Sequence, residues 1–386
     1  GLPQWQGKFI DTVELAKIVF PTALSYKLGD LAQELGILHE NAHRADDDAK
    51  ATAMLLKTCW DQLLQLPLST LQQLHKRSFR LKSNLAQLFF EALQLKRSKV
   101  EHYDQYIFYH KLALRKLDLS MVEGTDIAEY PATRMDKIEK LKTTVPNFEE
   151  RPEQFQMMDF VWDSLNNREE MVIEASTGIG KTLAYLLPTF YFARKFNKKV
   201  GISTYTSHLM DQLLQEEIPR LERITGERVQ VALIKGMNHY VDVTRFAQQY
   251  MMQDDSYDET FVILQVLVWL AKTETGDLDE LNVSGGGQLF LDKIRKTTSS
   301  KPLEADFDFY ERALLKAKYA HILLTNHAMM FADTIRQTPI FNEIGGWIID
   351  EAHQFIQAAV TREEKLFAFK NWKYIFGQIG LYTDEA

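Results

Sequence analysis

One segment, Ala175-Ser-Thr-Gly-Ile-Gly-Lys-Thr182, constrains the fold of this chain more than any other. The short apolar run Met171–Glu174 before it predicts a strand, and Thr182–Arg194 after it predicts a helix that contains Pro188. Glycines permit backbone angles that turn successive N–H groups toward one anion, and a helix N-terminus adds a positive dipole end. The segment therefore predicts a phosphate-binding loop between a strand and a helix, against the alternative of a chance Gly-Lys-Thr turn.

The residue types in this loop predict a site for ATP and Mg²⁺. Lys181 has the length to reach the β- and γ-phosphates, and the hydroxyl of Thr182 is a ligand for Mg²⁺. The backbone before Lys181 is expected to surround the phosphates, through the residues Thr177, Gly178, Ile179 and Gly180.

A second motif, Trp347-Ile-Ile-Asp-Glu-Ala-His353, places two carboxylates after an apolar run. Trp347–Asp350 is a predicted strand, and an acidic helix start would be the ordinary explanation of Asp350 and Glu351. In combination with the phosphate-binding loop, the motif predicts that Asp350 holds Mg²⁺ and that Glu351 is the general base for the attacking water. His353 is expected to couple the ATP site to a nucleic-acid site.

Strands and helices alternate through the carboxy-terminal part of the chain. Val200–Thr204 and His321–Thr325 are further predicted strands, which favours an α/β fold with a parallel sheet. We predict a P-loop, RecA-like domain at 151–386 with an insertion at about 236–306, which contains an apolar helix at Phe261–Leu270. Residues 1–65 form a separate predicted segment, and residues 66–150 form a helical, basic connector.

The amino-terminal parts are predicted to be mostly helical. Ser25–Leu35, which Gly36 would end, Ala45–Leu64 and Leu71–Leu95 have apolar residues at helical spacing, and Tyr106–Leu117 alternates like a hairpin. From residue 72 to residue 116 the chain has ten Lys or Arg and three Asp or Glu. A strip of this kind neutralises phosphates, but a solvated helix face is the commoner explanation of such charge.

Composition excludes several classes of protein. Cys59 is the one cysteine of the sequence, so an internal disulfide and a cysteine-ligated metal cluster within the chain are excluded, and a reducing compartment, the cytoplasm, is predicted. The sequence has no apolar run near the roughly 20 residues that span a bilayer, and no signal peptide is visible, so no membrane association is expected. The net charge of −8 gives no global indication of nucleic-acid binding.

Together with the two motifs, three shorter segments resemble the first motor domain of DEAH-box helicases, in the branch that contains XPD and bacterial DinG. These segments are Arg151-Pro-Glu-Gln154, Ser203-Thr-Tyr-Thr-Ser-His208 and Leu324-Thr-Asn-His-Ala328. The resemblance implies that Arg151 and Gln154 bind the adenine end of ATP. It implies that a single strand, expected to be DNA, is bound through four residues: Thr204, Thr206, Asn326 and His327.

Two departures from that family are visible. Many members carry an iron–sulfur cluster on four cysteines, and here Lys235-Gly-Met-Asn-His-Tyr240 is followed by Val241 and Asp242 instead of a cysteine. The last cysteine of the family pattern would fall near Asp308. No iron–sulfur cluster is therefore expected. The sequence also ends before a second motor domain would begin.

His43-Arg-Ala-Asp-Asp-Asp-Ala49 resembles the last motif of the DnaQ-like (DEDDh) 3′–5′ exonucleases. The resemblance implies that His43 is the general base and that Asp48 binds Mg²⁺ or Mn²⁺. An acidic helix N-terminus would also explain this run. The other carboxylates of that family are not in the sequence, which predicts the carboxy-terminal half of an RNase H-like exonuclease domain.

The order of exonuclease, connector and motor resembles the DinG-type fusions of Gram-positive bacteria, so we expect this chain to be an internal fragment of such a protein. The predicted function is an ATP-dependent 3′–5′ exonuclease/helicase acting on single-stranded DNA. One alternative is a DNA-binding module that ATP switches without unwinding. Another is that the isolated fragment binds its ligands without catalysis.

Overall fold

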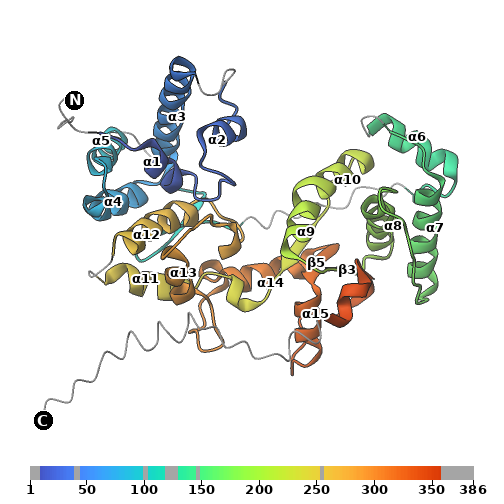
Figure 1. The fold of residues 1–386 in the computed structure, drawn as a ribbon. Coiled ribbons are helices and arrows are strands. Elements are labelled where there is room, and N and C mark those ends of the chain that lie inside the picture. The colour runs from blue at the N-terminus through green and yellow to red at the C-terminus, as the bar shows by residue number, and fades with distance from the viewer. Residues whose placement is uncertain are drawn as a thin grey trace, which may run out of the picture. The chain divides into compact units, whose positions relative to one another are not determined.

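The computed structural model describes residues 9–38, 44–98, 103–117, 129–144, 148–252 and 256–357 (Figure 1). The chain divides into two compact units. Unit 1 comprises Gly1–Ser120 and Gly236–Leu315, and unit 2 comprises Met121–Lys235 and Lys316–Ala386. The domain boundaries given above from the sequence stay a prediction.

Unit 2 contains a four-stranded sheet in the order β4-β5-β3-β6, and every neighbouring pair is parallel. The register places Ile202 opposite Leu324 on one side and opposite Ile348 on the other. The predicted α/β class with a parallel sheet is thus confirmed, although strand β4 was not among the predicted strands. The strands are β3 (Lys199–Thr204), β4 (Val231–Ile234), β5 (Ile322–Asn326) and β6 (Ile344–Ile349).

The core of unit 2 lies between this sheet and its helices. The predicted helix with Pro188 in its interior is confirmed as α8, whose residues from Leu183 to Ala193 are all buried. Beside it, the Tyr130 ring stacks on Trp162 with 4.1 Å between ring centroids. The helices are α6 (Arg134–Thr144), α7 (Pro152–Asn167), α8 (Lys181–Phe196), α9 (Ser207–Gln212), α10 (Ile218–Thr225) and α15 (His327–Thr334), with a short turn η6 (Ala352–Gln354).

The predicted strand at Met171–Glu174 is wrong, because the structure has no regular secondary structure there. The side chain of Val172 is 96% exposed and that of Met171 is 43% exposed. A strand is stabilised by a ladder to a neighbour. The described residues show no such ladder for this segment, so its apolar composition does not produce a strand.

Unit 1 is mainly helical and is built around α12. Every residue from Val262 to Leu270 in this helix is buried, as expected for a helix that is apolar on all sides. A capping box of Ser256 and Glu259 begins it. The helices are α1 (Thr12–Val19), α2 (Leu28–Glu34), α3 (Ala45–Gln65), α4 (Leu68–Arg77), α5 (Leu85–Arg97), α11 (Val243–Met251), α12 (Tyr257–Leu270), α13 (Gly287–Ile294) and α14 (Phe309–Tyr319), which runs on into unit 2.

Several local predictions in unit 1 are confirmed and one is corrected. Gly36 follows α2 with a φ of 67°, and the predicted hairpin is β1 (Tyr106–Tyr109) with β2 (Leu112–Arg115). The pattern of Leu71–Leu95 predicts one helix, but the chain forms α4 and α5 with the turn η1 (Ser78–Arg80) between them. The carboxylate of Glu14 accepts hydrogen bonds from the backbone N–H and the hydroxyl of Ser83 and so fixes the break.

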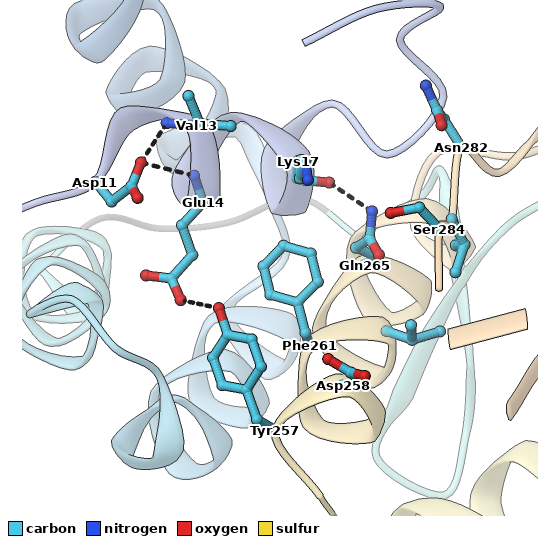
Figure 2. A pocket seen from close by; sticks show the side chains of 12 residues that line it. Asp11, Val13, Glu14, Lys17, Tyr257, Asp258, Phe261, Gln265, Asn282 and Ser284 are labelled. Carbon is cyan, nitrogen blue, oxygen red and sulfur yellow. Dashed lines mark hydrogen bonds between the residues drawn. The ribbon is translucent and has the colours of Figure 1, made fainter. Parts of the chain in front are cut away.

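A pocket of about 210 Å³ lies between α1 and α12 in unit 1 (Figure 2). The Tyr257 hydroxyl donates to Glu14 Oε1 at 2.6 Å, and Gln265 Nε2 donates to the Lys17 carbonyl at 3.1 Å. These bonds join the amino-terminal segment to the predicted insertion. In the described part of the chain, no helix has the length and hydropathy needed to cross a bilayer.

Candidate nucleotide-binding site

The loop before α8 has the backbone that its glycines predict. Gly178 and Gly180 have φ angles of 85° and 83°, in the left-handed region that favours glycine. Gly180 is the N-cap of α8, and no side chain caps the helix there. The first N–H groups of α8 therefore lack a capping side chain, and N–H groups of this kind bind phosphate oxygens in nucleotide sites.

The structure brings the two predicted catalytic residues together. Lys181 Nζ lies 3.2 Å from Glu351 Oε1, and the two side chains are 31% and 36% exposed. Glu351 has a φ of 50° and a ψ of 49°, a left-handed conformation that is uncommon for residues other than glycine. Strained backbone of this kind is concentrated at functional sites, because the surrounding structure must enforce it.

Asp350 is held at the carboxyl end of β6 by backbone and side-chain bonds. Its N–H donates to the Ser203 carbonyl at 2.9 Å, which continues the β3–β6 ladder. The Tyr185 hydroxyl donates to Asp350 Oδ2 at 3.1 Å, and burial raises the pKa of Tyr185 well above its ordinary value. Sequence reasoning missed Tyr185. Its place three residues after Thr182, on the same face of α8, is the signal that indicates it.

Arg151 and Gln154 contact the loop directly. Arg151 Nη1 donates to the Gly178 carbonyl at 2.6 Å, and Gln154 Nε2 donates to the Gly180 carbonyl at 3.0 Å. A Cβ atom added to Gly180 would lie 2.1 Å from Gln154 Nε2, so this approach requires glycine. The two residues thus lie at the predicted site, and their binding of adenine stays a prediction.

The residues predicted to bind nucleic acid have structural partners. Thr204 is fully buried, and its hydroxyl donates to the Thr206 carbonyl at 3.2 Å. The Thr206 hydroxyl accepts from the Leu209 N–H as the N-cap of α9, and Asn326 Oδ1 accepts from the Met329 N–H as the N-cap of α15. These capping roles are the ordinary ones for such residues, and contacts with nucleic acid stay a prediction.

His327 and His353 differ in their surroundings. His327 is fully buried, with Nδ1 2.7 Å from the Ser203 hydroxyl, and burial lowers its pKa. Its ring lies 5.2 Å from that of Phe355, so β3, α15 and the turn after Glu351 meet at this histidine. The His353 side chain is 68% exposed, and its Nδ1 lies 3.5 Å from Glu351 Oε2.

The donor set fits a nucleotide with a divalent cation. An uncapped helix start, a cation at Lys181 and a carboxylate at Asp350 are the groups that phosphates and Mg²⁺ require. Thr182 supplies a hydroxyl in the first turn of α8. Helicase domains in general need ATP and a divalent metal ion, and exonuclease domains in general need a divalent metal ion.

The predicted nuclease residues are not brought together in the described structure. His43 lies outside the described residues. Asp48 lies in the first turn of α3, and the Thr52 hydroxyl donates to its carbonyl at 2.7 Å. Its neighbours Asp46 and Asp47 form ion pairs with Arg44 and Lys50 at 3.5 and 3.4 Å.

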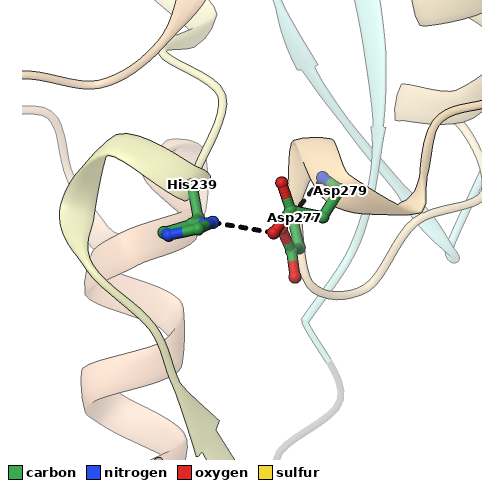
Figure 3. Close-up of side chains that lie close together, drawn as sticks. All are labelled: His239, Asp277 and Asp279. Atoms are coloured by element: carbon green, nitrogen blue, oxygen red, sulfur yellow. Dashed lines mark hydrogen bonds and ion pairs between the residues drawn. The ribbon is translucent and has the colours of Figure 1, made fainter. Parts of the chain in front are cut away.

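Ion pairs occupy the region where the helicase family pattern would place cysteines. His239 Nδ1 lies 2.7 Å from Asp279 Oδ2, and Figure 3 shows the imidazole pointing toward Asp277 and Asp279. One potential ligand atom from each of the three lies within 4.8 Å of the others. Lys296 forms a buried ion pair with Asp308.

Two family models match the chain: "Exonuclease" at residues 2–56 and "DEAD/DEAH box helicase" at residues 155–257. The chain is 36% identical over 355 residues to the 3′-5′ exonuclease DinG of Bacillus subtilis (strain 168). This alignment covers 91% of the chain and 38% of that protein. It is 32% identical over 383 residues to the 3′-5′ exonuclease DinG of Staphylococcus aureus (strain USA300). This alignment covers 98% of the chain and 41% of that protein.

The resemblance to DinG-type proteins is confirmed. The chain spans about two fifths of the length of these DinG relatives. The two family models match in the order predicted from the motifs, with the exonuclease before the DEAD/DEAH helicase.

Proposed function

We propose that this chain belongs to an ATP-dependent 3′–5′ exonuclease/helicase that acts on single-stranded DNA in the cytoplasm. Residues 1–65 contribute the second half of the nuclease domain, residues 66–150 a connector, and residues 151–386 the first motor domain with its insertion. The observation that carries the proposal is the 3.2 Å contact of Lys181 Nζ with Glu351 Oε1, which joins the two motifs at one edge of the sheet.

Each residue of the motor site has a proposed role in ATP hydrolysis. Lys181 and the N–H groups of Thr177, Gly178, Ile179 and Gly180 bind the phosphates, and Arg151 and Gln154 bind the adenine end. Thr182 and Asp350 hold Mg²⁺, which neutralises phosphate charge. Glu351 accepts a proton from the attacking water. Its release from Lys181 when phosphates bind to that lysine would free the carboxylate for this task.

The nucleic-acid and nuclease residues complete the proposal. Thr204, Thr206, Asn326 and His327 lie along the single-strand path, and His353 couples that path to Glu351. In the exonuclease, Asp48 holds Mg²⁺ or Mn²⁺ and His43 is the general base. This assignment is supported by the exonuclease model match at residues 2–56.

ATP turnover by the full-length gene product tests the assignment. Lys181→Ala is expected to reduce turnover by about 10²-fold or more, because the transferred phosphoryl group loses its cation. Lys142→Ala, an exposed lysine near the end of α6, is the matched control and is expected to leave turnover unchanged. Equal ATP turnover in Lys181→Ala and the unmodified protein would contradict the proposal.

In a second candidate function, the protein binds DNA and ATP changes its affinity for DNA without separating the strands. It is favoured by the residues that stand near the expected first and last cysteine positions, where His239 contacts Asp279 and Asp308 pairs with Lys296. Strand displacement on a forked duplex separates the two functions. ATP-dependent displacement would eliminate the second one. The isolated chain is expected to bind Mg·ATP weakly and to hydrolyse it very slowly, since ATP is normally hydrolysed with an arginine from a second motor domain.

A further inference from the structure

The turn η1 in unit 1 exposes a large aromatic side chain. Phe79 is 70% exposed, whereas its neighbour Ser78 is 1% exposed. The Ser78 hydroxyl donates to the His75 carbonyl at 3.0 Å, which directs Ser78 inward at the end of α4. A ring exposed to this degree on a fixed turn contributes little to the core and is accessible to a ligand.

The Phe79 ring belongs to a row of three rings on α4, η1 and α5. His75, four residues earlier, contacts Phe79 with 5.1 Å between ring centroids and contacts Phe90 at 5.3 Å. His75 Nδ1 lies 3.0 Å from the Ala86 carbonyl, which can only accept, so Nδ1 carries the hydrogen and the imidazole orientation is fixed. Phe90 is itself 38% exposed. The row is therefore an ordered and partly open aromatic surface.

Four cations lie close to this row in the sequence. From residue 62 to residue 90 the sequence has no Asp or Glu and has four cations: Lys76, Arg77, Arg80 and Lys82. Lys76 and Arg80 are exposed and flank Phe79 in the sequence. Arg77 and Lys82 lie over the rings of Tyr250 and Tyr257, at 4.7 and 4.5 Å from the ring centroids.

Two acidic groups near this region, both within the part of the chain that the structure describes, accept hydrogen bonds. Glu91, the first carboxylate that follows in the sequence, accepts a hydrogen bond from Gln87 Nε2 at 3.0 Å. Glu14 is buried and accepts from Ser83 and Tyr257. In a chain with a net charge of −8, this local excess of cations is a departure that favours a polyanionic ligand.

We propose that Phe79, with His75 and Phe90 beside it and Lys76 and Arg80 around it, forms a stacking platform for single-stranded nucleic acid. An unpaired base has a free π-face that stacks on an exposed ring, and the adjoining phosphates meet the cations. Bases inside a duplex are already stacked, so a duplex gains from the charge but not from the ring. The platform lies outside the nucleotide-binding site and does not depend on ATP hydrolysis.

Fluorescence anisotropy with a labelled dT20 oligonucleotide, without nucleotide, tests the platform in the full chain. Phe79→Ala is expected to weaken binding about tenfold, because base–aromatic stacking contributes at this level, and Phe79→Tyr is expected to retain it. Phe160→Ala is the matched control: Phe160 is 40% exposed on α7 but lies between Asp159 and Asp163. Binding of a blunt duplex is expected to be equal in all of these proteins.

The salt dependence tests the cations separately. Lys76→Gln with Arg80→Gln is expected to lower the slope of log K against log salt by about 1.4, since each single-strand phosphate contact contributes about 0.7. A 5-iododeoxyuridine oligonucleotide is expected to photocross-link to Phe79 in the tryptic peptide Ser78-Phe79-Arg80. Lys181→Ala is expected to leave that cross-link intact, so a failed platform and a failed ATP site give different results.

Three results would overturn the platform. One is a loss in Phe79→Ala no larger than in Phe160→Ala. The second is an equal loss for single strand and duplex, which would indicate a charge effect without stacking. The third is a cross-link that maps away from η1 while Phe79→Tyr and Phe79→Ala bind alike. Circular dichroism of each variant confirms that it is folded, as expected for changes at exposed side chains.

Discussion

The two units organise their polar residues in different ways. In unit 2, parallel strands end at one edge of a sheet, and residues 170 positions apart, Lys181 and Glu351, come within hydrogen-bond distance there. In unit 1, which is mainly helical, buried polar residues form pairs inside the unit, as Lys296 does with Asp308. The proposed nuclease residue Asp48 lies at the start of α3.

This difference shows what each architecture provides for a site. A parallel sheet directs the carboxyl ends of its strands to one edge, so distant motifs meet without extra constraints. A helical unit has no such edge, and its polar groups instead fix how the helices pack. We therefore expect substitutions in unit 2 to act first on chemistry and those in unit 1 to act first on stability.

The largest expected effect is on chemistry in unit 2. Glu351→Gln in the full-length gene product is expected to lower ATP turnover by about 10³-fold, since a positioned general base contributes at this level. Nucleotide affinity should be retained, because Lys181 is freed from its ion pair. Turnover by a coupled ATPase assay and affinity by a fluorescent ATP analogue measure the two effects. Glu170→Gln, an exposed residue before the loop, serves as control.

The second prediction concerns stability in unit 1. Asp308→Asn is expected to lower the free energy of unfolding by about 3 kcal/mol, because it leaves the charge of Lys296 buried beside a neutral amide. Asp308 Oδ1 accepts hydrogen bonds from the N–H groups of Tyr310 and Glu311 at 3.1 and 3.2 Å. The asparagine keeps a side-chain oxygen that can accept the same bonds. Urea denaturation followed by circular dichroism measures the change.

The exposed ion pair on α13 is the matched control for that measurement. Asp292, whose side chain is 62% exposed, lies 2.9 Å from Arg295, and Asp292→Asn is expected to change stability by less than about 0.5 kcal/mol. Equal effects of Asp308→Asn and Asp292→Asn would contradict the difference between the units.

The third expected effect is on nuclease activity, through a residue of unit 1. Asp48→Asn is expected to reduce 3′–5′ degradation of a labelled single strand by about 10²-fold or more in the full-length gene product, through loss of a metal ligand. ATP turnover should not change. Asp46→Asn, two residues earlier on the same turn of α3, is expected to leave both activities intact. A nuclease unaffected by Asp48→Asn would remove this residue from the site.

The smallest expected effect concerns stability in unit 2. Burial lowers the pKa of His321, with further lowering from Arg194, against an opposite effect of Glu227. The folded chain therefore resists protonation, whereas the unfolded chain takes up a proton below its pKa of about 6.5. The stability from neutral His321 is thus present above about pH 6.5 and is lost as the pH falls below it.

The partial exposure of His321 keeps its expected slope below about 1 kcal/mol per pH unit. Urea denaturation at several pH values between 7 and 5 measures that slope, and His321→Gln should reduce it. His353→Gln, at an exposed histidine of the same unit, should not. Identical slopes in the two variants would exclude His321 as the source.

Local patterns predicted the elements whose causes are local. The helix α8, the end of α2 at Gly36 and the strands β3, β5 and β6 follow from periodicity and from residues that permit special backbone angles. The motifs likewise predicted that Lys181, Asp350 and Glu351 belong to one ATP site. Asp350 and Glu351 follow β6 of the confirmed parallel sheet, whereas Lys181 begins α8 after a segment that forms no strand.

The differences arise where the cause is distant in the sequence. The break between α4 and α5 depends on Glu14, which accepts hydrogen bonds from Ser83, 69 residues away. The apolar run at Met171–Glu174 has the composition of a strand, but strand formation also needs a neighbouring edge. Tyr185 in an apolar helix has the pattern of a core residue, and only the fold shows its hydroxyl at Asp350.

The position of β6 has a practical consequence. Within the described residues β6 is the last strand of the sheet on its side, with β3 as its neighbour, and its side chains are all partly exposed. An uncovered strand edge offers a template for intermolecular pairing, and the exposed apolar Val172 adds to this tendency. Concentrated solutions of the isolated chain are therefore expected to self-associate, and a lysine introduced at Val172 is the first change to make for solubility.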